Sequence, residues 1–533
     1  MNTTLHGLRY VGDRKITLFE RLFFGAMFLL VFLFSIYFIT NIWIKWSASP
    51  MIITLNAHST PISEFPFPAV TICNMNQAKK SAVDKIPRFT VDYSLVQSLC
   101  TLSRYDDSNT TKPGKWHDFK RVLLKVSQPC DQMLIRCDYG GFESECMSLF
   151  KSILTDEGLC CIFNGLSEQR LMKDKYSQQQ LLTTNGSETV DGDKDWSPEK
   201  GYNPDDLKNK KDGVPRQAVA KNQFRISGTG NNLGLFLLLD VAEEEYYCSS
   251  TNSYGFKVLL HSPNETPKIA YFGTAVANGY ETRIIVIPTL SEASYSVRKV
   301  PKSVRQCLFE SENELIFYRT YSRRNCQMEC EARIFLTNCD CVRSRYNLSV
   351  LYYMPRFHED INICGRSDNP CVNRVIRELR TKTNSSFICE CLPGCYAIAY
   401  ETEISLSPLL PQSPLLQGKK LVVSDTAVLN IYFKEPSVRA QRKEELIGFT
   451  EFLSNTGGLL GLFMGFSVIS VIELFYFMSI RPYCNYLRIS ESRRRTFRKF
   501  FHKIRNRFGR KSDKVSKSIV AKHVNHPVFP YID

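Results

Sequence analysis

Residues 459–480 read LLGLFMGFSVISVIELFYFMSI, and this apolar run decides the architecture of the chain. It spans 22 residues and holds one charged side chain, that of Glu473. At about 1.5 Å per residue, a helix of this length crosses a hydrocarbon core of ~30 Å. Positive residues follow immediately, beginning with Arg481 and Arg488. Because Lys and Arg are retained on the cytoplasmic side, the pattern predicts a membrane span followed by a cytoplasmic tail.

A second apolar run lies near the N-terminus. Residues 22–44 read LFFGAMFLLVFLFSIYFITNIWI without a charge, and Trp43 and Trp46 lie at the end where an interfacial aromatic belt is expected. A signal peptide is the alternative, since Ser47-Ala48-Ser49 resembles a cleavage site, but its apolar core would measure only about 7–15 residues. Two spans place both termini in the cytoplasm and the long middle outside the cell.

The charge distribution supports this topology. The chain has 533 residues and a formal net charge of +15, which taken alone suggests nucleic-acid binding. Between Arg481 and Lys522, however, 15 Lys and Arg residues face two acids, so this stretch carries about +13, and residues 1–21 add about +2. The surplus therefore lies at the two ends, and we expect contact with anionic membrane lipid or a purely topological role, with no nucleic-acid partner.

Cysteines and glycosylation motifs point to the same arrangement. Of the 19 cysteines, 18 lie between the two apolar runs and only Cys484 lies beyond them. An even number of cysteines is typical of a disulfide-stapled domain in an oxidising compartment. Five N-x-Ser/Thr glycosylation acceptors occupy the same interval, at Asn109, Asn185, Asn264, Asn347 and Asn384.

The stretch between the spans is internally divided. Residues 165–221 are polar and predict a long loop or insertion. Short apolar runs at 235–241, 256–261 and 282–288 predict strands, as does the alternation within 397–435. Residues 301–396 are dense in cysteine, with the spacing C-x3-C-x8-C-x-C followed by C-x-C-x3-C. Zinc ligation is the alternative to disulfides here, but an oxidising compartment and scarce histidine favour a disulfide ladder along helices, and we expect no metal site.

The fold class is therefore α+β, with two transmembrane helices flanking a large disulfide-rich extracellular domain. The predicted parts are a cytoplasmic N-terminus (1–21), a first transmembrane helix (22–44), the extracellular domain (45–447), a pre-pore segment with the second transmembrane helix (448–480), and a basic cytoplasmic tail (481–533).

Several of these motifs resemble those of the degenerin/epithelial sodium channel family, and within it those of the insect pickpocket proteins. The matching segments are His6-Gly7, FPFPAVTICN (65–74), GLCCIFN (158–164), the ten cysteines from Cys307 to Cys395, and GGLLGLFMGFSVISVIELF (457–475). The resemblance implies a sheet-rich palm and β-ball, a helical finger, and a cysteine-rich thumb over 301–396. It also implies a subunit of a homomeric or mixed trimeric sodium channel in the plasma membrane.

The resemblance further implies a disulfide map. The pairs it predicts are Cys73–Cys160, Cys137–Cys146, Cys307–Cys395, Cys326–Cys391, Cys330–Cys389, Cys339–Cys371 and Cys341–Cys364. Four cysteines remain, at positions 100, 130, 161 and 248, and four cysteines allow three connectivities, so their pairing stays open.

The apolar run at residues 459–480, together with the glycines that precede it, contains the candidate pore. Gly457, Gly458 and Gly461 let helices approach closely and leave backbone carbonyls able to replace the water around a cation, although a packing face without ion contact is the alternative. By resemblance, the tripeptide Gly465-Phe466-Ser467 occupies the selectivity filter, although Phe466 departs from the small middle residue of many relatives.

Three further positions complete the candidate site. Glu473, a lone intramembrane carboxylate, is interpreted as attracting cations to the inner pore, with an interhelical hydrogen bond or snorkelling as the alternative. By resemblance, Ser454 occupies the degenerin position, where bulky residues hold the channel open. His6 and Gly7 resemble a gating motif, although His6 is otherwise an ordinary solvated residue of the tail.

The predicted function is passive conduction of Na⁺, without a cofactor, gated by an unidentified extracellular ligand or stimulus, amiloride-sensitive and sensory. Two other classes of protein are alternatives. A membrane-anchored ectoenzyme would need a catalytic constellation, and the chain has no G-x-S-x-G, H-E-x-x-H or phosphate-binding glycine loop, so we expect no enzyme. A non-conducting or regulatory cell-surface receptor subunit is the remaining alternative.

Overall fold

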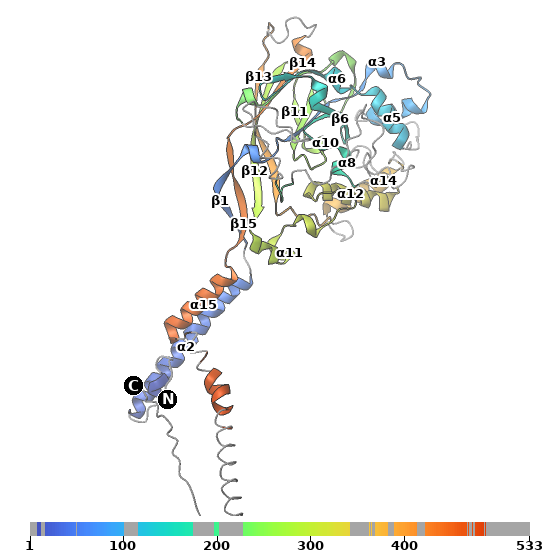
Figure 1. Cartoon of the computed structure of the whole chain (residues 1–533). Coiled ribbons are helices and arrows are strands. Elements are labelled where there is room, and N and C mark those ends of the chain that lie inside the picture. The colour runs from blue at the N-terminus through green and yellow to red at the C-terminus, as the bar shows by residue number, and fades with distance from the viewer. Residues whose placement is uncertain are drawn as a thin grey trace, which may run out of the picture. The chain divides into compact units, whose positions relative to one another are not determined.

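The computed structural model describes residues 8–11, 16–48, 51–100, 116–173, 197–201, 228–341, 362, 364, 368–381, 389–412, 422–465, 467, 472, 475–483 and 486. They belong to two units (Figure 1). One comprises the described parts of Met1–Ala48 and Ile447–Asp533, and the other lies within Ser49–Leu446. Each unit is described by itself.

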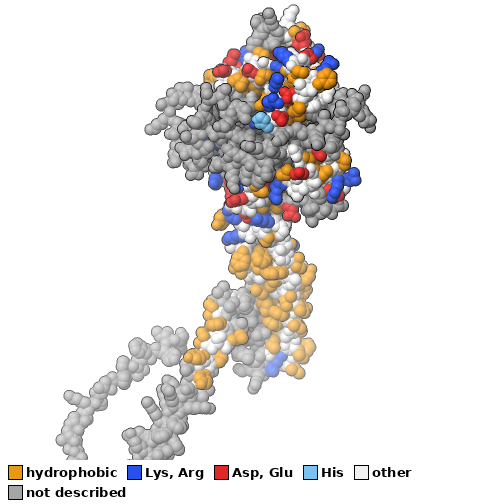
Figure 2. All heavy atoms as spheres, turned by 90° about the vertical axis from the view of Figure 1, so that its right-hand side faces the viewer, with side chains coloured by type: hydrophobic (Ala, Val, Ile, Leu, Met, Phe, Trp, Pro, Cys, Tyr) orange, Lys and Arg blue, Asp and Glu red, His pale blue; other side chains and the backbone are white. Residues whose placement is uncertain are grey.

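The first unit is built on two apolar helices, α2 (Leu18–Ser47) and α15 (Phe449–Met464). Among the described residues, α2 is the one helix long and apolar enough to cross a membrane. It begins at a capping box, in which Thr17 and Glu20 satisfy each other's backbone N–H groups. Hydrophobic side chains cover most of the visible face of these helices (Figure 2). This exposed apolar surface is expected of helices whose solvent is lipid.

The second apolar run differs from a single uninterrupted helix over residues 459–480. The helix begins ten positions earlier, at Phe449, and ends at Met464. Gly465 and Ser467 are not helical, and a short π-helical turn occupies Tyr476–Ile480. The described residues therefore interrupt the helix expected over this run at Gly465, a break that the apolar pattern of the sequence does not indicate.

The second unit contains two β-sheets that enclose the main core. The larger sheet has the order β1-β15-β12-β14-β8-β4-β5, with β13 paired to the other edge of β12, and the smaller has the order β11-β10-β2-β7-β6. The strands of the larger sheet are β1 (Met51–Pro61), β4 (Leu134–Tyr139), β5 (Phe142–Ser144), β8 (Leu235–Asp240), β12 (Tyr280–Ala293), β13 (Ala397–Pro408), β14 (Thr426–Phe433) and β15 (Ser437–Glu445). Those of the smaller sheet are β2 (Ala69–Asn74), β6 (Phe150–Thr155), β7 (Gly158–Phe163), β10 (Phe256–His261) and β11 (Thr274–Val276).

The facing sides of the two sheets form one apolar core. Phe67, which precedes β2, is fully buried and contacts Phe163 of β7 and Phe433 of β14 with ring centroids 5.9 and 5.3 Å apart. Edge-to-face contacts of this kind add to the stabilisation from burial. The strands expected at 235–241, 256–261, 282–288 and within 397–435 are all present, and the mixed α+β class is confirmed.

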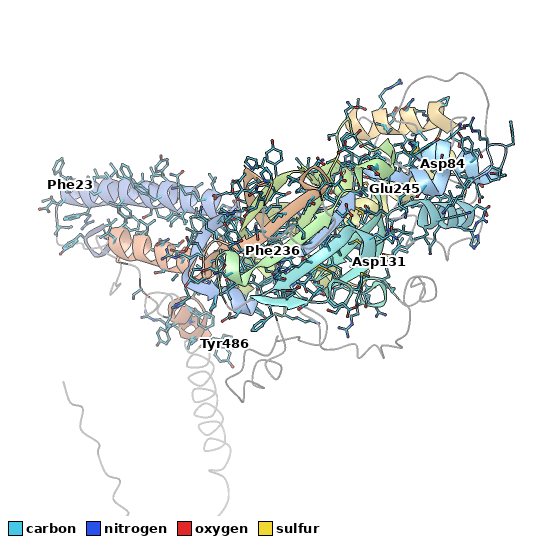
Figure 3. The ribbon with its side chains drawn as sticks, turned by 90° about the horizontal axis from the view of Figure 1, so that it is seen from above. Phe23, Asp84, Asp131, Phe236, Glu245 and Tyr486 are labelled. Atoms are coloured by element: carbon cyan, nitrogen blue, oxygen red, sulfur yellow. A yellow bond between two sulfur atoms is a disulfide. The ribbon has the colours of Figure 1, made fainter. Side chains whose placement is uncertain are left out.

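Helices pack around a second core at one end of this unit. The amphipathic helix α5 (Trp116–Val126) buries Phe119, Leu123 and Val126 beside α4 (Val91–Cys100) and the two-stranded antiparallel sheet of β3 (Asn76–Lys79) and β9 (Tyr246–Ser249). At the same end, the Glu245 carboxylate accepts a hydrogen bond from the Ser81 N–H at α3 (Lys80–Val83), 3.0 Å away (Figure 3).

The cysteine-dense segment forms two stapled helices, α12 (Arg323–Cys339) and α14 (Asn369–Thr381). Ile334 and Phe335 of α12 pack against Val372 and Val375 of α14, and five half-buried cysteines surround this small core. A core this small needs covalent support, which disulfides supply by restricting the unfolded chain, typically by about 2–4 kcal/mol each.

Nine disulfides join all 18 cysteines between the two apolar runs, seven of them in the pairs that the resemblance implies. The other two, Cys100–Cys248 and Cys130–Cys161, resolve the pairing that the sequence left open. Cys160 and Cys161 are consecutive on β7, so their side chains point to opposite faces of the sheet, and each face receives one bridge.

Candidate functional site

The candidate pore helix α15 packs antiparallel to α2. Ring contacts join Trp46 to Phe452 and, farther along, Phe38 to Phe463, with centroids 4.7 and 5.8 Å apart. Residue numbers rise along one helix as they fall along the other. The two helices therefore form a hairpin, and the two contacts fix which side of α15 faces α2.

The opposite side of α15 is made of small residues. Ser454, Gly457, Gly458 and Gly461 are all exposed, and they recur at helical spacing about 200° around the axis from Phe452. A Cβ atom added to Gly457 or Gly458 would meet no atom within 4 Å. Among the described residues, this face is therefore free of contact with the same chain, as required of a surface that meets other subunits or an ion path.

The helix ends at the first residue of the predicted filter. Gly465 adopts the left-handed conformation, with φ +61° and ψ +27°, and its N–H donates to the carbonyls of Gly461 and Leu460. Glycine reaches this conformation without the strain that a Cβ imposes. Phe463 stacks on Phe38, which lies about 12 Å along α2 from Trp46, so a hydrocarbon core of ~30 Å that begins at Trp46 would have the break near its middle.

A helix break at this depth has a chemical consequence. Non-helical backbone is tolerated at membrane depth only where protein buries it or where it lines a water-filled cavity, because lipid offers no hydrogen bonds. Gly465 and Ser467 both lie in this non-helical segment. The arrangement can thus present backbone and hydroxyl oxygens to a partly dehydrated cation.

Other predicted positions lie outside the described residues. These are His6, Gly7, Phe466, Glu473 and the glycosylation acceptors Asn109, Asn185, Asn347 and Asn384. Their predicted roles remain predictions. Most of the polar stretch 165–221 is outside the described residues as well.

Asn264 is within the described residues, and its burial argues against the prediction that it carries a glycan. The residue is only 4% exposed, and its backbone carbonyl oxygen accepts a hydrogen bond from the side-chain amide of Asn325 in α12 at 2.9 Å. Thr266, the third residue of the motif, is fully buried and donates to the Tyr318 hydroxyl at 3.1 Å. The folded chain leaves no room for a glycan there, and a local motif carries no information about such burial.

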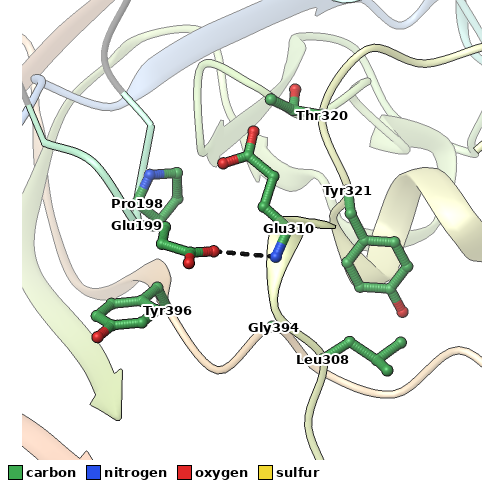
Figure 4. A pocket seen from close by; sticks show the side chains of 8 residues that line it. All are labelled: Pro198, Glu199, Leu308, Glu310, Thr320, Tyr321, Gly394 and Tyr396. Atoms are coloured by element: carbon green, nitrogen blue, oxygen red, sulfur yellow. Dashed lines mark hydrogen bonds between the residues drawn. The ribbon is translucent and has the colours of Figure 1, made fainter. Parts of the chain in front are cut away.

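Part of the polar stretch is anchored. Residues Ser197–Gly201 form a turn in which Glu199 pairs with Arg298 at 2.5 Å and accepts a hydrogen bond from the Glu310 N–H at 3.0 Å (Figure 4). A small pocket beside this turn is lined by Pro198, Glu199, Leu308, Glu310, Thr320, Tyr321, Gly394 and Tyr396. Among the described residues, no group of acids, histidines and cysteines is arranged to hold a metal ion.

A buried carboxylate was not foreseen from the sequence. Asp156, in the turn between β6 and β7, receives hydrogen bonds on Oδ1 from the N–H groups of Ile269 and Ala270, at 2.9 and 3.2 Å. Its Oδ2 is buried and has no hydrogen-bond partner among the described residues. Burial, aided by the neighbouring charge of Glu157, raises the pKa of Asp156 to about 7, although the hydrogen bonds from Ala270 and Ile269 and the charge of Lys268 oppose the shift.

Replacing this residue by Asp156→Asn is expected to flatten the pH dependence of stability. The folded-state pKa of about 7 exceeds the ~3.9 of an unfolded aspartate, so the folded chain binds more protons between these pH values. The contribution of Asp156 to wild-type stability is therefore greatest below about pH 4, falls as the pH rises toward 7, and levels off above it, by roughly a few kcal/mol in all.

Thermal unfolding of the purified full chain between pH 4 and 8 measures this difference. The exposed Asp131→Asn serves as the control and should preserve the wild-type profile. A profile for Asp156→Asn that runs parallel to that of the wild type would contradict the assignment.

Together these features define a class: a membrane protein with a helix hairpin whose second helix ends at a left-handed glycine, Gly465, and a disulfide-stapled α+β unit between the two helices in sequence. A family model described as "Amiloride-sensitive sodium channel" matches residues 1–477. The chain belongs to this family.

Individual relatives agree with the family match. The chain is 42% identical to Pickpocket protein 28 of Drosophila melanogaster over 91% of its own length and 78% of the relative. It is 22% identical to Sodium channel protein Nach of Drosophila melanogaster over 92% of the chain and 88% of the relative, and 23% identical to Acid-sensing ion channel 2 of Homo sapiens over 77% and 72%. The predicted resemblance is confirmed.

The family fixes the general function. The chain is a sodium channel subunit of the degenerin/epithelial sodium channel type, a plasma-membrane protein that assembles with like or related subunits. Members of this family are ion channels, so the chain is not an enzyme.

Proposed function

We propose that the small-residue face of α15, from several subunits, surrounds a common axis and conducts Na⁺. The observation that carries this proposal is the helix break at Gly465, which leaves non-helical backbone at mid-membrane depth on a helix whose Ser454–Gly461 side is open. One hairpin cannot enclose a pore, so several subunits are required, and the family resemblance favours three.

Each predicted position has a role in this scheme. Gly465, Phe466 and Ser467 form the filter, and Gly457, Gly458 and Gly461 line the path above it. Glu473 attracts cations on the inner side. His6, Gly7 and Ser454 act in gating. Na⁺ is the permeant ion, and no cofactor takes part.

The proposed topology has two spans, with both termini in the cytoplasm. The antiparallel packing of α2 and α15 supports it, because a hairpin brings both distal ends to one side of the membrane. The basic residues of 1–21 and 481–533 then lie on the cytoplasmic side. Residues 45–447 lie outside, where their nine disulfides remain oxidised and where Asn109, Asn185, Asn347 and Asn384 carry glycans.

An extracellular stimulus gates the channel in this proposal, and amiloride blocks it. The covalent path supports such coupling. β1 and β15 pair from Met51 and Glu445 onward, and residues 48–50 and 446–448 connect them to α2 and α15. A change in this β-ribbon therefore reaches both membrane helices at once, as a sensory channel requires.

Voltage-clamp of cells that express the chain, alone and with related subunits, tests the proposal. The expected result is an amiloride-sensitive current whose reversal potential follows the Na⁺ gradient. Surface labelling must accompany the recording. A chain that reaches the surface yet passes no Na⁺ in any combination would overturn the proposal and favour a regulatory, non-conducting subunit.

A further inference from the structure

Four aromatic side chains join α2 and α15 at one end of the hairpin. Trp46 stacks on Phe452 with centroids 4.7 Å apart, and it also contacts Phe449 at 6.4 Å. Trp43 contacts both Trp46, at 5.2 Å, and Phe452, at 5.8 Å. We call Trp43, Trp46, Phe449 and Phe452 the aromatic clasp.

Such a cluster matters more in a membrane than in water. Lipid tails are as apolar as the side chains, so burial alone does not hold two helices together, and specific packing must do so. Aromatic pairs at these distances supply packing of defined geometry, beyond the area they bury. The clasp therefore fixes the rotation of the first turns of α15 against α2.

The rotation of α15 against α2 also sets which way Ser454 points, because Ser454 is close to the clasp in sequence. Phe452 lies two residues before Ser454, which places the two side chains about 200° apart around the helix. The stack of Phe452 on Trp46 holds Ser454 and Gly457 on the side of α15 that faces away from α2. If the stack opens, α15 is free to turn, and Ser454 leaves that side.

In sequence, the residues of the clasp are close to the short segments that lead from α2 to β1 and from β15 to α15. Only residues 446–448 separate Phe449 from β15, and residues 48–50 separate α2 from β1. A movement that enters α15 from the ribbon meets the clasp before it reaches any residue of the small-residue face.

We propose that Trp46 and Phe452 are positioning residues for gating, which set the orientation of the Ser454–Gly461 face through their stack. The inference rests on the proposed function of that face. It assigns to α2 a direct part in gating, in addition to anchoring the chain.

The test measures the orientation of Ser454 without relying on current. A Ser454→Cys chain is expressed at the cell surface, and its reaction rate with a membrane-impermeant maleimide is measured. The introduced thiol reports alone on the extracellular side, because all 18 cysteines between the helices form disulfides. Trp46→Ala, Phe452→Ala and both together are then added to this chain.

Each single change is expected to alter the reaction rate by about 3- to 10-fold, the range that corresponds to one aromatic pair. The double variant should change it no more than the larger single variant, because both remove the same stack. The conservative Trp46→Phe should keep the parent rate. Ile44→Ala, on an α2 residue that is 56% exposed and makes no ring contact among the described residues, is the matched control and should also keep it.

The proposal would be overturned if the rate change in the double variant equalled the product of the two single changes. It would also be overturned if Ile44→Ala changed the reaction rate as much as Trp46→Ala or Phe452→Ala does. Sodium current is recorded from the same cells. If the parent chain passes no current but the Trp46 and Phe452 variants still change the maleimide reaction rate as expected, the proposed pore is contradicted and the role of the clasp is not. If the chain conducts but these variants leave the reaction rate unchanged, only the role of the clasp is refuted.

Discussion

Replacing Gly465 by alanine is expected to reduce the sodium current by at least tenfold while the chain still reaches the cell surface. Gly465 adopts φ +61°, a conformation that costs other residues roughly 1–2 kcal/mol. This conformational cost applies in every subunit, and a free-energy difference of about 1.4 kcal/mol already corresponds to a tenfold change in an equilibrium constant. The left-handed break is therefore lost or displaced, and the oxygens proposed to hold Na⁺ move with it.

The current of Gly465→Ala is compared with its surface level by labelling. Gly448→Ala is the matched control, since Gly448 has φ −75° and an added Cβ there meets no atom within 4 Å. That variant should conduct like the wild type. A Gly465→Ala channel with normal amplitude and normal Na⁺ selectivity would contradict the role given to the break.

Replacing Ser454 by phenylalanine is expected to produce a constitutive sodium current about tenfold above the resting wild-type level. Ser454 lies on the face of α15 that is open within one subunit, where subunits approach one another in the proposed assembly. Close approach needs small side chains, and a bulky ring prevents it. The state in which these helices lie apart is then favoured without any stimulus.

Whole-cell current without a stimulus, with and without amiloride, measures this effect. Ser454→Ala keeps the small size and should keep the channel closed at rest. The prediction fails if Ser454→Phe and Ser454→Ala give the same resting current at equal surface levels.

Much of the architecture could be predicted because its signals are local. Apolar runs, alternation and cysteine number are written in short stretches of sequence, and the strands and disulfide-rich class followed from them. The start of α15 could not be read this way. Glu451 and Asn455 interrupt the apolar pattern before residue 459, yet ring contacts of Phe449 and Phe452 with α2 hold these residues in the helix.

The features that could not be predicted from the sequence depend on contacts between residues that are far apart in the chain. The burial of Asn264 is set by Asn325 and that of Thr266 by Tyr318, both more than 50 positions away. The raised pKa of Asp156 likewise depends on burial beside residues 268–270. The resemblance locates the filter tripeptide in the sequence. It does not show that Gly465, the first residue of the tripeptide, adopts a left-handed backbone conformation.

Cysteine scanning of α15 tests directly whether its small-residue face lines the path of the ion. In the Ser454→Phe channel, cysteines are placed one at a time on both sides of the helix, and the effect of a charged, water-soluble thiol reagent on the current is recorded. Rapid inhibition is expected at Gly457→Cys, Gly458→Cys and Gly461→Cys, and no inhibition at Phe452→Cys, Leu459→Cys or Phe463→Cys. Inhibition at the second set with none at the first would show that the small-residue face does not line the path of the ion.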